Sequence, residues 1–166
     1  GIKTKEDDDV AHFFTAMMHD KVLFFSSKGL VYSLSVYDFP EGSRQSKGLP
    51  VVNLIQVEKG EMVNSIVKVT KDEIGVVDNL IFVTKSGLVK RTSLEEFKNI
   101  RQSGKICITL REDDELIAVK KTTGNDFVLL GSSNGRMVKF NENDVRIMGR
   151  TASGVKGIEL DDSTCI

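Results

Sequence analysis

Basic side chains recur at corresponding places along this chain, and the chemistry they suit is electrostatic binding of phosphate groups. The 166 residues carry a net charge of −1, which by itself disfavours a nucleic-acid partner. Acidic residues, however, form short runs, whereas basic residues collect around the segments that lead to Gly48, Gly104 and Gly154. A cation that recurs once per structural unit forms a stripe when the units stack, and a stripe can bind a polyanion whatever the net charge. The candidates are Arg44, Lys47, Arg101, Lys105, Arg146, Arg150 and Lys156.

Residues that could carry out catalysis are scarce. The sequence contains no GxSxG, HExxH, Walker-type lysine loop or CxxC motif. Tyr32 and Tyr37 follow the first glycine turn in a β-rich run, so we expect them to pack across strands rather than act as nucleophiles. The acidic runs are typical of solvated turns rather than metal sites. We expect Cys107 and Cys165 to be separate, reduced, packed thiols, and the chain to have no catalytic residues.

The elements that must position the cations come from an internal repeat. Three segments share an apolar run, a polar turn that ends in glycine and a second β-rich run. They are residues 22–39 (VLFFSSKGLVYSLSVYDF), 80–97 (LIFVTKSGLVKRTSLEEF) and 127–145 (FVLLGSSNGRMVKFNENDV). The turn glycines, Gly29, Gly87 and Gly135, are 58 and 48 residues apart, and the second series of glycines is 56 and 50 residues apart. Two series in step indicate one unit of about fifty residues used three times, as in propellers and solenoids.

The local pattern predicts an all-β fold of about three four-stranded antiparallel blades. The predicted hairpins pair residues 22–26 with 30–36, 80–84 with 88–92, and 127–131 with 136–140. Further strands are predicted at 10–16, 51–57, 63–69, 105–110, 116–120 and 155–160. Short helical turns capped by Ser93 and Asn141 are predicted at 93–97 and 141–145. No apolar stretch approaches the roughly 18 residues that a membrane span needs.

Two long strings give the chain a resemblance to a known family. Residues 21–61, KVLFFSSKGLVYSLSVYDFPEGSRQSKGLPVVNLIQVEKGE, resemble the first blade of the C-terminal domain of the bacterial DNA gyrase A subunit. The later VKRTSLEEFKNIRQSGKICITLREDDELIAV and RIMGRTASGVKGIEL resemble its second blade and the passage into the third and fourth. The resemblance implies a β-pinwheel, a propeller-like ring of usually six blades in which each blade lends a hairpin to its neighbour.

On this resemblance, residues 1–166 form one partial β-pinwheel domain with approximate repeats 1–53, 54–109 and 110–160, and the start of a fourth at 155–166. The chain opens with Gly1 rather than Met, so we expect a fragment of a longer protein. The basic box that precedes the first blade in gyrases is absent apart from at most this glycine. Strand edges left open by a partial ring would favour self-association of the fragment.

The resemblance implies a non-catalytic domain that wraps duplex DNA around its convex rim to support negative supercoiling. Implied partners are duplex DNA, the rest of the gyrase A subunit, and the gyrase B subunit in an A2B2 holoenzyme in the bacterial cytoplasm. No cofactor is expected in this fragment, since ATP and Mg²⁺ would be used by other domains. Wrapping would rely on phosphate contacts without base readout. Further candidate contacts from the hairpins are Lys28, Lys85, Lys90, Arg91, Arg136 and Lys139.

Three alternatives stay open at the level of sequence. The first is the corresponding domain of the topoisomerase IV A subunit, whose basic box is often degraded. The second is a propeller-type protein-interaction module, which would need exposed aromatic or Met anchors in its loops. The third, a propeller enzyme, would need convergent polar residues at the ring centre, where the repeats place apolar or small residues instead.

Overall fold

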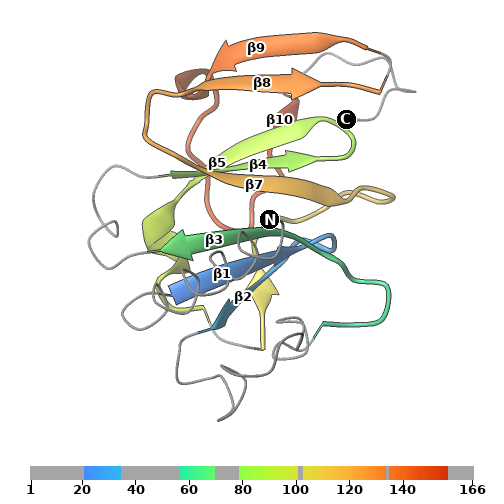
Figure 1. The fold of residues 1–166 in the computed structure, drawn as a ribbon, viewed down its shortest axis with the longest axis vertical. Coiled ribbons are helices and arrows are strands. Elements are labelled where there is room, and N and C mark those ends of the chain that lie inside the picture. Colours follow the sequence, from blue (N-terminus) through green and yellow to red (C-terminus); the bar gives the residue numbers. More distant parts are fainter. Residues whose placement is uncertain (1–20, 35–56, 70–78, 101–102, 134, 157–166) are drawn as a thin grey trace, which may run out of the picture.

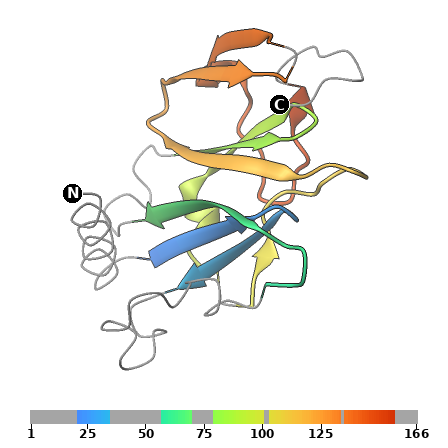
Figure 2. The same cartoon turned by 45° about the vertical axis from the view of Figure 1, so that its right-hand side comes forward.

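The structure is a computed structural model in which three layers of β-strands are stacked (Figures 1 and 2). It describes residues 21–34, 57–69, 79–100, 103–133 and 135–156. The described helical structure consists of two short 3-10 turns, which confirms the all-β prediction. The elements are β1 (Lys21–Ser26), β2 (Leu30–Leu34), β3 (Val63–Val69), β4 (Asn79–Thr84), β5 (Leu88–Ser93), η3 (Leu94–Phe97), β6 (Lys105–Ile106), β7 (Leu116–Thr122), β8 (Phe127–Gly131), β9 (Met137–Asn141), η4 (Glu142–Asp144) and β10 (Val155–Lys156).

The three hairpins turn at the predicted glycines, with one shared geometry. In each turn the glycine amide donates to the carbonyl oxygen three residues earlier, at 3.0 to 3.1 Å, and the glycine φ lies between +77° and +93°. A Ser or Thr hydroxyl at the start of each turn accepts the amide of the residue four positions later. A tight turn that closes on a left-handed residue favours glycine. The prediction for Gly29, Gly87 and Gly135 is therefore confirmed.

Strands are exchanged between neighbouring units. The first sheet has the order β3-β1-β2-β6 and the second has the order β10-β5-β4-β7, and all their pairings are antiparallel. β6 follows the second hairpin along the chain but pairs with β2, and β10 follows the third hairpin but pairs with β5. Each unit thus lends a strand to the preceding sheet. The described part of each of these strands has two residues, and the exchange of a whole hairpin implied by the family resemblance stays a prediction.

The hairpin strands of the first two sheets are buried on both faces, and the second sheet packs between the first sheet and the third hairpin. Leu23 and Phe25 of β1 pack against Leu80 and Phe82 of β4 in the main hydrophobic cluster. The Phe25 and Phe82 rings meet edge to face at 5.6 Å, and both contact the ring of Phe97 from η3. The opposite face of β4 packs through Val83 against the β8–β9 hairpin. A strand covered on both sides needs a continuous apolar run, as these segments have.

Several predicted elements differ in extent. The strand predicted at 105–110 ends at Ile106, because the amides of Cys107 and Ile108 both point to the carbonyl of Gly29, at 2.9 and 3.4 Å. The strand at 155–160 is described only as far as Lys156, and those at 10–16 and 51–57 lie almost wholly outside the described residues. The third blade shows two strands in the part described. The two predicted helical turns are confirmed as η3 and η4, with Ser93 and Asn141 as their caps.

The repeat boundaries at residues 53 and 109 do not coincide with the sheets. β3 lies in the second predicted repeat but pairs with β1, and β7 lies in the third but pairs with β4. Each four-stranded sheet therefore combines the hairpin of one predicted repeat with two strands of the next. Among the described residues, no helix is long and apolar enough to span a membrane.

Candidate nucleic-acid interface

Each of the first two sheets has one edge formed by a long strand, β3 or β7, and an opposite edge formed by a short strand, β6 or β10. At the first edge, Asn64 of β3 donates to the carbonyl of Leu116 at 2.8 Å, and the amide of Val119 in β7 donates to Ser65 at 2.9 Å. We call this side the β3–β7 edge. We call the opposite side, formed by β6, β10 and residues 146–154, the exchange edge. The exchange edge is the place where segments from consecutive units meet.

Four of the predicted DNA-binding residues lie on the exchange edge. Three of them are exposed: Lys105 in β6, Lys156 in β10, and Arg146 in the segment before β10. None of the three has an ion-pair partner among the described residues. Arg150 is half-buried, and its guanidinium donates to the carbonyl of Ile106. The edge thus presents cations from two successive sheets. The remaining candidates of this group, Arg44, Lys47 and Arg101, lie outside the described residues.

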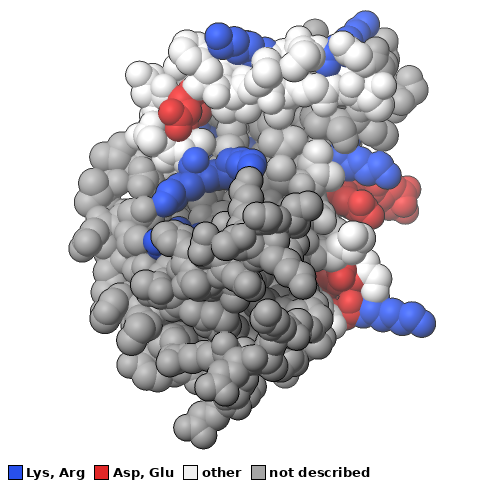
Figure 3. All heavy atoms as spheres, in the orientation of Figure 1, with Lys and Arg blue, Asp and Glu red and all other residues white. Residues whose placement is uncertain are grey.

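The cations of the hairpin turns have acidic neighbours. Lys28 forms an ion pair with Glu58 at 3.2 Å. Lys85 is exposed beside Ser86, whose amide and hydroxyl both donate to Asp114, at 2.9 and 2.6 Å. Figure 3 shows this mixture on its right-hand side, where blue and red side chains lie next to one another. A polyanion would have to compete with these carboxylates, so the turn side is less suited to phosphate than the exchange edge.

The third hairpin carries the last two exposed candidates. Arg136 is exposed in the turn, and Lys139 of β9 lies with its Nζ 4.7 Å from the centroid of the Phe127 ring. That face of the hairpin also exposes Leu129 and Met137, with Phe127 at 68% and Met137 at 64% exposure. The corresponding positions of the second hairpin, Asn79, Ile81 and Val89, are buried, and Val89 packs against the third hairpin. This open face is compatible with the predicted self-association, which stays a prediction.

Lys90 is a correction to the predicted set, because its side chain is 0% exposed. Its ammonium group donates to the carbonyl oxygens of Cys107, Arg150 and Gly149, at 2.5, 2.6 and 3.2 Å. It also lies over the Phe82 ring, 4.8 Å from the centroid. Burial lowers the pKa of Lys90 to about 8 and raises the pKa of the Cys107 thiol to about 12. Lys90 is not accessible to a phosphate, and the prediction of a buried thiol is confirmed for Cys107.

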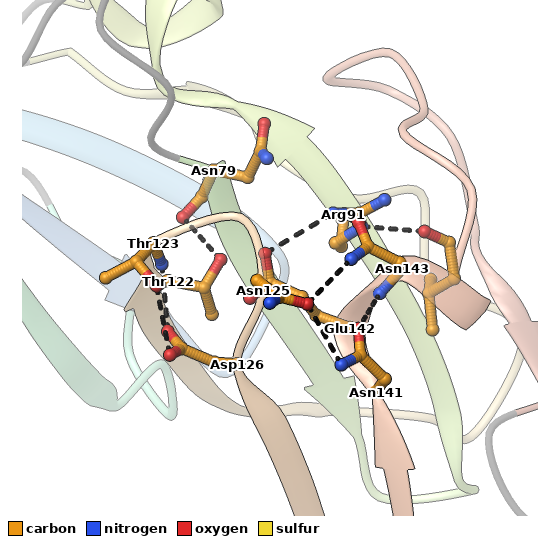
Figure 4. A network of polar contacts seen from close by, with 10 residues as sticks. Asn79, Arg91, Thr122, Thr123, Asn125, Asp126, Asn141, Glu142 and Asn143 are labelled. Carbon is orange, nitrogen blue, oxygen red and sulfur yellow. Dashed lines mark hydrogen bonds and ion pairs between the residues drawn. The ribbon is translucent and has the colours of Figure 1, made fainter.

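Arg91 is the second correction, since it is 6% exposed and bound within the protein. Its Nε donates to the carbonyl of Val145 at 2.6 Å, and its Nη1 lies 3.4 Å from both Glu142 and Asn143. Figure 4 shows Arg91 pointing into this polar network between β5 and η4. The fully buried Glu142 keeps one carboxylate oxygen without a described hydrogen-bond partner. Removal of Arg91 would therefore leave a buried charge unpaired.

The sequence held a signal for the burial of Lys90. When the turn glycines are aligned, Lys90 corresponds to Tyr32 in the first unit and to Val138 in the third. Tyr32 is buried opposite Phe24 in the register of the first sheet, as the sequence predicted for an aromatic residue that packs across strands. A cation at a position occupied by Tyr and Val in the other units indicates an internal side chain rather than a surface contact.

A second basic surface lies on the β3–β7 edge. A groove of about 400 Å³ runs between the two strands and is lined by Lys68, Lys120 and Lys121 together with Asn64 and Ile66. In Figure 3, Lys and Arg side chains gather around the left-hand end of β7. Lysines on exposed edge strands also protect a sheet from pairing with another chain. The groove therefore serves as a basic reference surface for testing the exchange edge.

Comparisons with known proteins place the chain near bacterial topoisomerase subunits. A family model described as "DNA gyrase C-terminal domain, beta-propeller" matches residues 20–70, 78–123 and 126–163. The chain is 48% identical over 160 residues to a DNA gyrase A subunit of Staphylococcus epidermidis, and 48% identical over 162 residues to that of Ureaplasma parvum. These matches cover 96% and 98% of the chain but only 18% and 19% of the relatives.

Two solved structures share the fold over most of the chain. A C-terminal domain of DNA topoisomerase IV superimposes with a TM-score of 0.81 and 29% identity, over 89% of this chain and 46% of the other. A DNA gyrase A C-terminal domain gives a TM-score of 0.68 and 24% identity over the same shares. The latter likeness concerns the fold alone.

Proposed function

Since this chain belongs to the DNA gyrase C-terminal domain family, we propose that it binds and bends duplex DNA along its exchange edge as a non-catalytic part of a gyrase A subunit. The observation that supports this most directly is the exchange of strands. It brings Lys105 of one unit and Arg146 and Lys156 of the next to a single edge of two stacked sheets. Cations repeated along one edge can neutralise successive phosphates, with largely sequence-independent and salt-sensitive affinity.

The proposal includes the larger assembly. The chain would act with the rest of a gyrase A subunit, and with a gyrase B subunit, in the bacterial cytoplasm to support negative supercoiling. Strand cleavage and the ATP- and Mg²⁺-dependent steps would be carried out by other domains, and no cofactor is assigned to this fragment. Elastic bending of a short duplex costs several kcal/mol, roughly 1–6. Contacts to phosphates must therefore recur along the exchange edge, and the edge allows this because each successive unit contributes cations to it.

The topoisomerase IV alternative is favoured by its TM-score of 0.81, which is higher than the 0.68 of the gyrase A domain. The sequence argues the other way, because gyrase A relatives are 48% identical over nearly the whole chain while the topoisomerase IV domain is 29% identical. Sequence divergence is the sharper discriminator between two families that share one fold. We therefore retain the gyrase assignment.

The test compares the two basic surfaces by neutralising three cations on each. The variant Lys105→Gln, Arg146→Gln, Lys156→Gln removes cations from the exchange edge, and the variant Lys68→Gln, Lys120→Gln, Lys121→Gln removes the same charge from the β3–β7 groove. We expect only the first variant to weaken DNA binding. The loss of affinity should be the same for duplexes of unrelated sequence. The slope of log affinity against log salt should become shallower by roughly 0.9 for each phosphate that is no longer neutralised. Equal losses in both variants, or no salt-dependent binding by the wild-type chain, would overturn the proposal.

A further inference from the structure

Two consecutive connecting segments meet at Lys90 on the inner side of the exchange edge. The ammonium group donates to the carbonyl oxygen of Cys107, just after β6, and to those of Gly149 and Arg150, before β10. The first segment belongs to the second unit and completes the first sheet. The second belongs to the third unit and completes the second sheet. An ammonium group has three N–H donors, so all three are directed at these carbonyls.

Other bonds hold the same two segments together. Thr109 donates its hydroxyl proton to the carbonyl of Thr151 at 2.6 Å, and the Arg150 guanidinium donates to the carbonyl of Ile106. The amide of Ala152 bonds back to Gly149 at 3.1 Å and closes the turn between them. These contacts make the meeting point of the segments a defined junction, with Lys90 at its buried centre.

A cation suits this position because the carbonyls converge on it from two chain segments. An apolar side chain would take the described donor away from the carbonyls of Cys107 and Arg150, whereas the carbonyl of Gly149 would keep the amide of Ala152. Leaving two partly buried acceptors without a donor is costly. The Phe82 ring beneath the ammonium group adds a favourable contact. On the opposite face of β5, the Arg91 side chain donates to the carbonyl of Val145. The backbone carbonyl of Arg91 accepts the amide of Met148 at 2.7 Å. The segment that leads to β10 is therefore fixed from both faces of β5.

We propose that Lys90 is a positioning residue that couples the connecting segments of two successive units and so sets the spacing between Lys105 and the cations around Arg150. This rests on the proposed DNA binding at the exchange edge. Phosphates along duplex DNA have a fixed spacing, so cations supplied by two units act together only if their relative placement is fixed. Lys90 contributes to binding without touching DNA.

The experiment uses the variant Lys90→Met, which keeps the length and apolar character of the stem but removes the charge. The control Lys98→Met removes the same charge from an exposed side chain that pairs with Glu95 at 3.7 Å. Affinity is measured for a duplex of about 10 base pairs, which can reach one unit, and for one of about 40 base pairs, which can reach several. Fluorescence transfer between the ends of the longer duplex reports its bending.

We expect Lys90→Met to bind the short duplex within about twofold of wild type. The long duplex should bind about tenfold more weakly and bend less, the size expected when one member of a coupled network is lost. Lys98→Met should leave both duplexes unchanged. An equal loss for short and long duplexes would show direct phosphate contact or a general loss of folding and would overturn the proposal, as would no change for either duplex.

A local readout separates this proposal from the proposed function. Hydrogen exchange at the amides of Ala152 and Cys107 should accelerate in Lys90→Met and not in Lys98→Met. If the wild-type chain binds no DNA but these amides still respond, the junction is as described and the exchange edge is not a DNA surface. If the amides do not respond, the positioning role fails whatever the DNA result. Should Lys90→Met not fold, Lys90→Gln, which keeps two amide donors, supports the same comparison.

Discussion

The first and second hairpins share their backbone path but differ in the chemistry of their second strands, β2 and β5. In both, a residue of the second strand lies directly opposite a Phe, giving the pairs Phe24 with Tyr32 and Phe82 with Lys90. Tyr32 packs in a small apolar cluster with Val22, Phe24 and Leu34, and its hydroxyl donates to Glu61 at 2.6 Å. Lys90 instead reaches three carbonyls of two lent segments.

The difference shows that the repeated units share the path of the backbone, whereas the side chains at equivalent positions make different contacts in each unit. In the first sheet, the lent segment passes over the ring of Tyr32 at Gly104, where a Cβ would come within 2.6 Å of the ring. In the second sheet, Gly154 passes equally close to the carbonyl of Val89, where a Cβ would lie 2.7 Å from the carbonyl oxygen. One segment is held by packing against a ring, the other by two cations on opposite faces of β5.

The strongest test of this contrast is the loss of Arg91. Arg91→Met should lower the free energy of unfolding by about 3–5 kcal/mol, because it leaves the buried Glu142 carboxylate without its cation. Ser33→Ala, at the corresponding position of the first hairpin, should cost less than about 1 kcal/mol. Urea denaturation of the two variants measures both values.

The double variant Arg91→Met, Glu142→Met serves as the control. Replacing both members of a buried ion pair by apolar side chains is often close to neutral, so we expect most of the lost stability to return. If Arg91→Met is as mild as Ser33→Ala, the two hairpins do not differ in how they hold the following segment.

The two close glycines should respond differently to alanine. Both variants should lose about 1–3 kcal/mol of unfolding free energy or more, because both glycines have positive φ. Gly154→Ala should lose more than Gly104→Ala, because Gly154 faces a backbone carbonyl that cannot move aside. The Tyr32 ring near Gly104 can shift. A double-mutant cycle should therefore show coupling above about 0.5 kcal/mol between Gly104→Ala and Tyr32→Leu.

The matching cycle between Gly154→Ala and Lys90→Met is the control, and we expect a coupling near zero there, since the obstacle is the carbonyl of Val89. Equal coupling in the two cycles would contradict the distinction between a side-chain and a backbone obstacle. Thermal unfolding of the single and double variants supplies these values.

The last comparison concerns a single side-chain hydrogen bond, made by the Tyr32 hydroxyl. Tyr32→Phe removes the donor to Glu61 and should cost about 2 kcal/mol at neutral pH, as expected for a hydrogen bond to a charged group. Burial by itself raises the pKa of Glu61, but hydrogen bonds from Ser26 and Tyr32 outweigh it and lower the pKa below its ordinary 4.5. Burial and the neighbouring Glu61 raise the pKa of Tyr32, so its hydroxyl stays protonated.

The pH dependence follows from the sign of the Glu61 shift. A carboxyl whose pKa is lowered on folding contributes stability above its unfolded pKa and loses it as the pH falls through the folded value. The stability difference between wild type and Tyr32→Phe should thus be constant above the ordinary pKa of 4.5 and shrink at lower pH. Urea midpoints from about pH 7 to about pH 3 would show this, and a difference independent of pH would contradict it.

Much of the fold was predictable because it rests on local rules. The glycine turns, the apolar strands and the caps at Ser93 and Asn141 depend on φ preferences, burial and side-chain hydrogen bonds that neighbouring residues determine. The candidate site was predictable only in part. Lys105 and Lys156 are exposed on the predicted stripe, whereas Lys90 and Arg91 are buried, since periodicity within a strand does not show what packs on either face.

The sequence alone determined the unit, its period and the positions where the chain must turn, because these depend on the intrinsic preferences of glycine and of apolar runs. Tertiary structure decided which sheet each strand completes. β6 and β10 leave their own units because the positive φ of Gly104 and Gly154 and the absence of a side chain let them pass closely over Tyr32 and Val89. That exchange buries Lys90 at a junction of two segments and exposes Lys105 at the edge, although both residues are lysines of the same unit. Burial is a property of the assembled neighbours, so the pattern within one unit could not separate the two, and only the alignment of Lys90 with Tyr32 and Val138 indicated the difference.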